Sequence, residues 1–137
     1  MTTELKVVLK EDNLAEVAAI FENNKIHHIP VVDGRKLIGL ISKSDFLLFS
    51  HAHKADHDDE KIEAIRLEKY GVEEIMTTGI AKLSPNDNIR VAIEIFRENI
   101  FHSIPIVDNG NLVGIVTTYD IIDQLAVDNE AYISYTD

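Results

Sequence analysis

The chain has 137 residues with 24 acidic and 13 basic side chains, so its net charge at pH 7 is 13 − 24 = −11. Nucleic acids and anionic lipids are bound by clustered lysines and arginines, and here these residues are scattered among acidic neighbours. We therefore expect no nucleic-acid or membrane partner. The net charge does not bear on a small, local anion-binding pocket. The 45% hydrophobic content is typical of a globular protein.

The absence of cysteine excludes a disulfide scaffold, a thiolate metal site and a cysteine nucleophile. Apolar runs such as residues 46–49 are far shorter than the roughly 20 residues that span a bilayer. The N-terminus also lacks a signal-peptide pattern. These features predict a cytoplasmic protein.

The sequence repeats itself with a shift of 75 residues, which places Met1 on Met76. The register holds without a gap from Met1 to Asp45, with about 16 identities in those 45 pairs. Chance does not produce such agreement, so we expect two copies of one structural unit.

Each copy begins with a short apolar stretch, at 5–9 and 80–83, which predicts a strand. An Asp-Asn pair then offers helix N-cap side chains, at 12–13 and 87–88. Apolar residues follow with the i, i+3, i+4, i+7 spacing of an amphipathic helix. Their positions are 14, 17, 18 and 21 in the first copy and 89, 92, 93 and 96 in the second.

Two further strands and a second helix complete each copy. The strands at 29–32 and 104–107 end in Asp33-Gly34 and Asn109-Gly110, which predict tight hairpins to strands at 37–41 and 112–116. Because proline lacks the N–H that a strand donates, we expect Pro30 and Pro105 at a sheet edge or at the first residue of a strand.

The fold class is thus α/β, with two β-α-β-β-α repeats. A unit of about 45 residues is too small to bury its own apolar faces, so we expect the two to pack about a pseudo-two-fold axis. The predicted boundaries are 1–50 for repeat 1, 51–75 for a variable helical linker, 76–127 for repeat 2, and 128–137 for an acidic tail. Within the linker, 58–70 reads as an exposed helix.

These residues resemble the tandem CBS domain, a regulatory module named after cystathionine β-synthase. Three motifs carry the resemblance: the lead-in Ile75-Met76-Thr77, a strand ending in Pro-Val-Val-Asp or close to it, and a Gly-apolar-apolar-Ser/Thr-x-x-Asp segment. The third motif occurs at 39–45 and at 114–120. The duplicated order, spacing and helical periodicity strengthen the identification.

The resemblance implies a pair with two clefts at the seam between the repeats, where members of the family commonly bind adenine nucleotides. It implies that the motif aspartate contacts ribose and that the preceding Ser or Thr holds ribose or phosphate. It also implies phosphate contacts from the two residues before the apolar-Pro step. The matching residues are Ser42, Asp45, His27 and His28 in repeat 1, and Thr117, Asp120, His102 and Ser103 in repeat 2. Ile29 and Ile104, the apolar residues of that step, are also candidate site residues.

Other readings stand beside each of these roles. Ser42-x-x-Asp45 and Thr117-x-x-Asp120 also fit a helix capping box, which is compatible with ligand contact. The histidines could be polar groups at a sheet edge. Alternatively, they and Lys43 meet phosphate charge, and affinity would then rise on acidification.

Three apolar or aromatic residues complete the candidate site. Tyr119 precedes Asp120, so its ring could stack on a ligand or fill the site. Leu5 and Ile80 could form walls against adenine, or they could be plain core. We rank the repeat 1 site slightly higher because of its histidines and Lys43.

The linker run 51–59 is rich in histidine, and His53 and His57 have the i, i+4 spacing of two metal ligands. The run is charged and has no apolar shell, so a solvated surface is the favoured interpretation and no metal site is predicted. No phosphate loop, HExxH or Gly-x-Ser-x-Gly motif occurs, and we expect no enzymatic activity and no required cofactor.

The sequence therefore predicts a regulatory module that binds AMP, ADP, ATP or S-adenosylmethionine and acts on a partner protein or an attached domain. A homodimer is also expected. The alternatives are a dimerisation or interaction module with vestigial clefts and, third, a metal-responsive linker.

Overall fold

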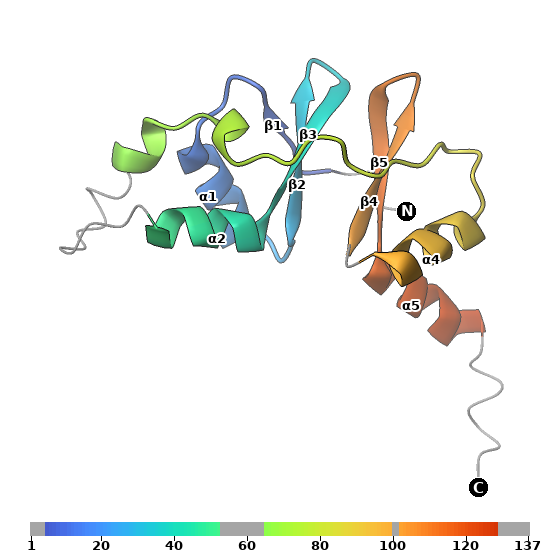
Figure 1. The fold of residues 1–137 in the computed structure, drawn as a ribbon. Coiled ribbons are helices and arrows are strands. Elements are labelled where there is room, and N and C mark those ends of the chain that lie inside the picture. Colours follow the sequence, from blue (N-terminus) through green and yellow to red (C-terminus); the bar gives the residue numbers. More distant parts are fainter. Residues whose placement is uncertain (1–4, 53–64, 100–101, 129–137) are drawn as a thin grey trace, which may run out of the picture. The chain divides into compact units, whose positions relative to one another are not determined.

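The computed structural model describes residues 5–52, 65–99 and 102–128 (Figure 1). The chain divides into two compact units, and each is described by itself. The N-terminal unit contains Lys6–Ile80 and Gly110–Leu112. The C-terminal unit contains Leu5, Ala81–Asn109 and the described residues from Val113 onward.

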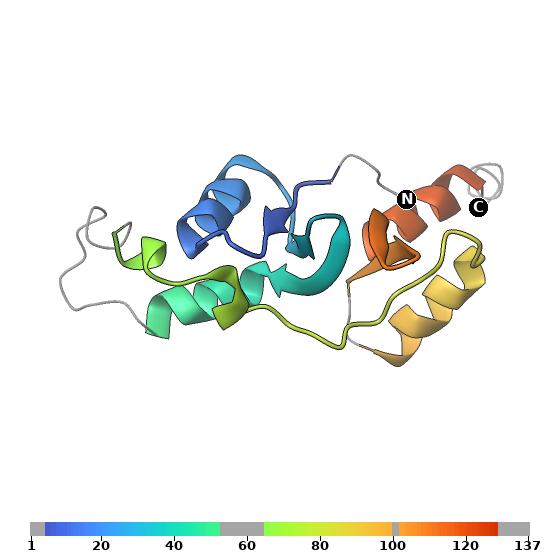
Figure 2. The ribbon, with the colours of Figure 1, turned by 90° about the horizontal axis from the view of Figure 1, so that it is seen from above.

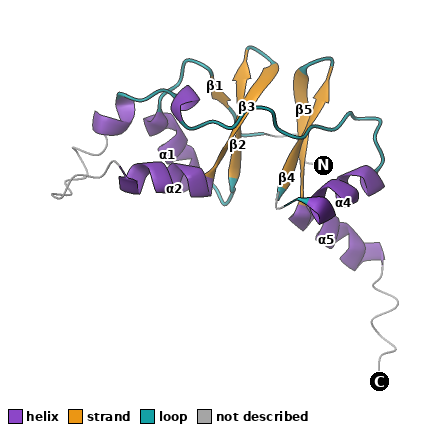
Figure 3. Cartoon of the chain, in the orientation of Figure 1, coloured by secondary structure: helices purple, strands orange, loops and turns teal. Residues whose placement is uncertain are grey.

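Each unit combines strands with helices, which confirms the predicted α/β class (Figure 3). In the N-terminal unit the elements are β1 (Val8–Leu9), α1 (Leu14–Asn23), β2 (His28–Asp33), β3 (Lys36–Ser42), α2 (Lys43–Ala52) and the 3₁₀ helix η1 (Val72–Glu74). The second copy supplies α4 (Ile89–Glu98), β4 (Ser103–Asp108), β5 (Asn111–Thr117) and α5 (Thr118–Asp128). The predicted pseudo-two-fold packing of the repeats stays a prediction.

In the N-terminal unit, β2 lies between β1 and β3. Val8 pairs with Val31 in the parallel sense, and β2 runs antiparallel to β3. The first strands are shorter than predicted, because β1 covers two residues and the matching stretch of the second copy makes a single bridge, from Leu83 to Ile106. Local apolar character therefore marked the right segments but overestimated how much of each one pairs.

The predicted place of Pro30 is wrong, because Pro30 is the third residue of an internal strand. It pairs with Leu40 on one side, whereas the pairing with β1 starts one residue later, at Val31. The missing N–H therefore interrupts no bond to β1.

Both hairpins turn through residues with positive φ. Gly34 has a φ of 64°, and the second turn uses Asn109 and Gly110 with φ of 52° and 85°. Glycine and asparagine tolerate this region best. In the first hairpin Asp33 pairs with Lys36, so the turn residues are Gly34 and Arg35, one position later than predicted.

The helices α1 and α2 lie on one face of the N-terminal sheet (Figures 1 and 2). The predicted stripe of α1 is inward, with Leu14, Val17 and Phe21 buried. The rings of Phe21 and Phe46 lie 5.7 Å apart and join α1 to α2. Asn13 caps α1 as predicted, because its side chain accepts a hydrogen bond from the Glu16 N–H at 3.2 Å.

The core of the C-terminal unit is smaller. Its buried members are Leu83, Ala92, Ile104, Ile106, Val116 and Ile121. The stripe of α4 is covered only in part, since Ala92 is buried while Ile89 is 51% exposed. Asn88 caps α4, accepting from the Arg90 N–H at 2.9 Å.

The end of the linker and the lead-in of repeat 2 pack against repeat 1. Residues 65–68 are helical, and Leu67 and Val72 are buried in the N-terminal core. Most of the helix predicted at 58–70 lies outside the described residues, and Leu67 shows that its last turn is not wholly exposed. Among the described helices, none has both the length and the apolar character required to cross a bilayer.

The lead-in is fastened to β3 by two backbone hydrogen bonds. The N–H of Thr77 donates to the Leu40 carbonyl at 2.8 Å, and the Leu40 N–H donates to the Thr77 carbonyl at 3.0 Å. The side chain of Met76 then covers Gly39, where an added Cβ would lie 2.6 Å from the Met76 sulfur and 3.2 Å from its Cβ. The motif glycine is thus explained by this close approach.

We expect Gly39→Ala to lower the free energy of unfolding by about 1–3 kcal/mol, because the new methyl group displaces Met76 from the core. Gly71→Ala is the matched control, since its Cβ would meet nothing closer than the Asp12 carbonyl oxygen at 4.0 Å. Urea unfolding of both variants measures the difference. Equal stabilities would contradict the assigned role of Gly39.

Candidate functional site

The start of α2 is tied to the residue that precedes β2. The Lys43 N–H donates a hydrogen bond to the His27 carbonyl at 2.8 Å. This bond follows from the strand register, because His28 pairs with Ser42 and the two residues lie one step beyond that pair. In the second repeat the Thr118 N–H donates to the His102 carbonyl at 3.0 Å. The same connection is therefore built twice.

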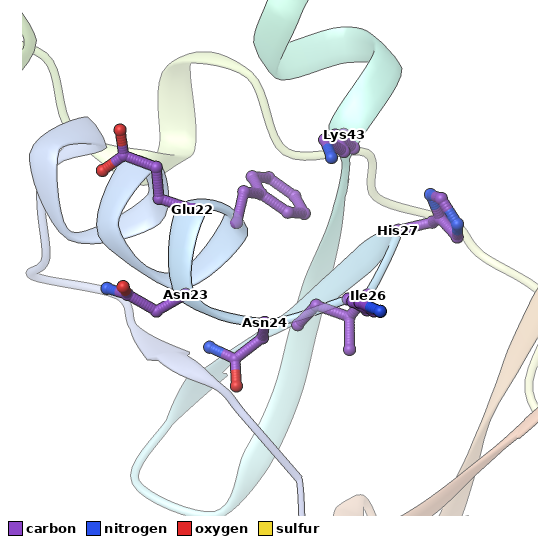
Figure 4. A pocket seen from close by; sticks show the side chains of 8 residues that line it. Glu22, Asn23, Asn24, Ile26, His27 and Lys43 are labelled. Atoms are coloured by element: carbon purple, nitrogen blue, oxygen red, sulfur yellow. The ribbon is translucent and has the colours of Figure 1, made fainter.

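Beside this bond in the first repeat is a pocket of about 550 Å³ (Figure 4). It lies where α1 ends, β2 begins and α2 begins. Its lining residues are Phe21, Glu22, Asn23, Asn24, Lys25, Ile26, His27 and Lys43. Two predicted site residues, His27 and Lys43, are thus brought together by the fold.

The pocket combines apolar and cationic groups. The buried Phe21 and the half-buried Ile26 are its apolar lining residues. Figure 4 shows Glu22 on one side and His27 and Lys43 on the other. With neutral histidine, the formal charge of the lining is +1, from two lysines and one glutamate, in a chain of net charge −11. The pocket can therefore attract an anionic group locally.

Two asparagines shape the end of α1 at the pocket. The Asn23 side-chain amide donates to the Ala19 carbonyl and the Asn24 amide donates to the Ile20 carbonyl, both at 2.9 Å. Each bond connects a residue at the end of the helix to a carbonyl about one turn earlier in the same helix. Each amide nitrogen thus already donates one of its two N–H groups to the helix, and the basic side chains are the cationic donors of the pocket.

Ser42 and Thr117 cap the helices that follow them, which confirms the capping interpretation. The Asp45 N–H donates to the Ser42 hydroxyl and the Asp120 N–H donates to the Thr117 hydroxyl, both at 3.0 Å. Two of the N–H groups that open α2, those of Lys43 and Asp45, therefore already have acceptors.

The two motif aspartates differ. Asp120 is half-buried, and its carboxylate accepts a hydrogen bond from the Thr117 N–H at 2.9 Å, which completes a reciprocal capping box. Asp45 is exposed, and no hydrogen bond to its carboxylate is recorded among the described residues. The Asp45 carboxylate is consequently the more available acceptor.

Several other predicted residues, including Ser42 and Asp45, do not line the pocket. Ile29 is fully buried in the core. His28 is half-buried in β2, and Leu5 and Ile80 are half-buried as well. Their predicted contacts with ligand stay predictions.

In repeat 2, Ile104 is fully buried, and His102 is exposed next to it in sequence. Ser103 is buried, and its hydroxyl has no hydrogen-bond partner among the described residues. Tyr119 is 72% exposed, so its ring is not packed into the C-terminal core.

Two charged residues of the pocket, Glu22 and Lys25, were missed by the sequence analysis, and Lys25 is the cationic one. The signal for Lys25 was present, because it stands two residues before His27 and shortly after the apolar positions 14–21 of the predicted helix. Only the approach of that helix end to the start of α2 shows that Lys25 and Lys43 belong to one pocket.

His53 and His57 lie outside the described residues. Within 5–52, 65–99 and 102–128, no group of three or more His, Cys, Asp or Glu side chains is placed to hold a metal ion.

Comparisons with known proteins agree with the repeat. The CBS domain family matches residues 1–52 and 72–127. The uncharacterized protein MJ1426 of Methanocaldococcus jannaschii is 32% identical over 143 aligned residues, which cover 87% of this chain and 84% of that protein. The CBS domain-containing protein YhcV of Bacillus subtilis is 28% identical, over 88% of this chain and 79% of that one.

The fold is similar to that of CBSX2 in its crystal structure in complex with AMP. The TM-score is 0.76 at 22% identity, and the alignment covers 95% of this chain and 94% of CBSX2. The family match at both segments, together with the relative at 32% identity, shows that this chain belongs to the CBS domain family, with two copies of the domain.

We expect Asp120→Ala to lower the free energy of unfolding by about 1 kcal/mol, because it removes the acceptor of the Thr117 N–H. Asp45→Ala is the matched variant and should lower it by less, since no such bond is recorded at Asp45. Chemical denaturation without nucleotide measures both. A larger loss at Asp45 would contradict the difference in capping.

Proposed function

We propose that this CBS domain protein is a regulatory module that binds an adenine nucleotide at its first repeat, with the phosphate beside His27 and Lys43. The observation that carries the proposal is the pocket in which these two side chains meet. The module is not itself an enzyme and acts in the cytoplasm on a partner protein or an attached domain. AMP, ADP, ATP and S-adenosylmethionine are the candidate ligands.

The phosphate end of the ligand is matched by charge. A phosphate monoester carries about −1.5 to −2 charges at pH 7 and has strong acceptor oxygens. Lys43 supplies an ammonium donor, and His27 supplies an imidazole N–H that gains a second donor on protonation. Charge-assisted hydrogen bonds of this kind are roughly twice as strong as neutral ones.

The ribose end is proposed to meet Asp45. Its exposed carboxylate stands two residues after Lys43, at the start of the same helix. An ionised carboxylate can accept hydrogen bonds from both hydroxyls of a ribose. The Ser42 hydroxyl already caps α2, so we assign Ser42 to positioning of this helix start and a secondary contact with ligand.

Similarity to CBSX2, which was crystallised with AMP, supports the choice of an adenine nucleotide. The likeness at 22% identity establishes a shared fold, so the ligand is carried to this chain as a proposal. The basic side of the pocket gives that proposal its own support from this chain.

The module can signal if the ligand prefers one arrangement of the chain over another. The bond from Lys43 to His27 joins α2 to the start of β2, so a ligand in the pocket would contact residues of both elements. A partner that contacts either element would then respond to occupancy.

A second ligand position at repeat 2 would use Asp120, Thr117 and His102, with Ser103, Ile104 and Tyr119 nearby in sequence. The buried, unpartnered Ser103 hydroxyl favours a polar contact there. The Asp120 carboxylate already accepts one N–H bond, so we propose that this position is the weaker of the two.

An interaction module that forms a homodimer is the second candidate. Exposed apolar side chains on two helices favour it, namely Leu47 and Leu48 of α2 and Ile122 and Leu125 of α5. Leu48 is 71% exposed and Ile122 63%. A partner surface would remove this area from water.

We expect AMP to stabilise the chain against unfolding, by about 2.7 kcal/mol when it is present at 100 times its Kd. Thermal-shift and calorimetric titrations with AMP, ADP, ATP and S-adenosylmethionine measure the effect. Asp45→Asn should weaken binding of every ligand that contains ribose. A flat screen, together with dimerisation that depends on protein concentration, would instead favour the interaction module.

The two histidines at the start of β2 are tested separately. His27→Ala/His28→Ala should weaken AMP binding, because it removes the imidazole donors at the start of β2. Isothermal titration at one fixed pH measures the loss. Unchanged AMP affinity in this double variant would exclude both histidines from the site.

A further inference from the structure

The two repeats share a backbone arrangement but differ in charge where the first repeat has its pocket. The bond from the start of the second helix to the histidine carbonyl is 2.8 Å in the first repeat and 3.0 Å in the second. A histidine stands at the matching position in each, His27 and His102. The common frame allows the side chains around it to be compared position by position.

The lysines of the pocket have no counterpart in the second repeat. The shift of 75 residues places Lys25 on Ile100 and Lys43 on Thr118. Ile100 lies outside the described residues, so its comparison rests on sequence alone. Thr118 opens α5 with the same backbone bond that Lys43 makes, but its side chain carries no charge.

In the helix before each histidine, the charge at one pocket position changes from negative in repeat 1 to positive in repeat 2. Glu22 of the pocket corresponds to Arg97, which pairs with Glu94 at 3.3 Å on the exposed surface of α4. Asn23 corresponds to Glu98, an added negative charge. With neutral histidines, the formal charge is +1 for the pocket residues of repeat 1 and zero for the matching residues of repeat 2, where Arg97 and Glu98 cancel.

We infer that phosphate recognition in this chain belongs to the first repeat alone, where Lys25, His27 and Lys43 form an anion subsite, so that each chain binds one phosphorylated ligand. This inference rests on the proposed binding of an adenosyl ligand. It adds the assignment of phosphate binding to one of the two repeats. Lys25 becomes a specificity-determining residue, because it lines the pocket together with His27 and Lys43 and is the second lysine there. A ligand position in repeat 2 would contact the adenosyl part only and would not bind AMP more tightly than adenosine.

The test compares AMP with adenosine by isothermal titration of the full chain at constant ionic strength. For the wild-type chain we expect one AMP per chain and AMP affinity at least about tenfold above that of adenosine. The variant Lys25→Ile/Lys43→Thr gives the first repeat the residues of the second. It should lose the preference for AMP while it keeps the wild-type affinity for adenosine.

A matched control has the same change in net charge away from the pocket. Lys69→Ile/Lys82→Thr removes two exposed lysines that do not line it, and it should retain the wild-type preference for AMP. Circular dichroism and urea unfolding confirm that both variants are folded. A loss of preference in the control as well would attribute the effect to net charge and overturn the subsite.

The remaining outcomes separate this inference from the proposed function. If the wild-type chain binds adenosine and AMP and Lys25→Ile/Lys43→Thr still prefers AMP as strongly, the subsite is overturned while adenosyl binding stands. Two AMP molecules per chain with equal affinity would also overturn it. If neither adenosine nor AMP binds the wild-type chain, the proposed function itself fails.

Discussion

The hydrogen bond from the Lys43 N–H to the His27 carbonyl is the constraint on which the proposed site depends. The nitrogen-to-oxygen distance is 2.8 Å, and the bond connects the first residue of α2 to the residue that precedes β2. Because the bond uses backbone atoms, it fixes the two Cα positions while the imidazole and the ammonium remain available to a ligand. The end of α1 completes the pocket, held there by the packing of Phe21 on Phe46. Core packing and strand register thus determine where the cationic side chains meet.

The second copy shows what the backbone alone provides. It repeats the bond and the helix cap, yet threonine replaces lysine at the start of its helix. The capping box is also more complete there, because Asp120 accepts the Thr117 N–H whereas Asp45 is exposed. A carboxylate engaged in its own helix start contributes to stability, and a carboxylate left in solvent can serve a ligand. The duplication therefore conserves the frame, and the side chains divide the tasks of stability and recognition.

Features set by neighbouring residues in the chain were predictable from the sequence. Asn13 and Asn88 cap helices as expected, and the apolar stripe of α1 faces the core. Features set by distant contacts were not. The tolerance of Pro30 depends on where β1 begins to pair, and Gly39 is needed because a lead-in from the next repeat covers it. Lys25 was missed for the same reason, since its proximity to α2 arises from tertiary packing.

The most direct test of the central claim is an NMR titration of the isotope-labelled chain with AMP. The account predicts that the backbone amides of His27, Lys43 and Asp45 shift first and saturate together, with one apparent Kd. Their side chains and the closing bond form one unit, so their signals should report one binding event. Shifts confined to other parts of the chain, or a spectrum unchanged at millimolar AMP, would contradict it.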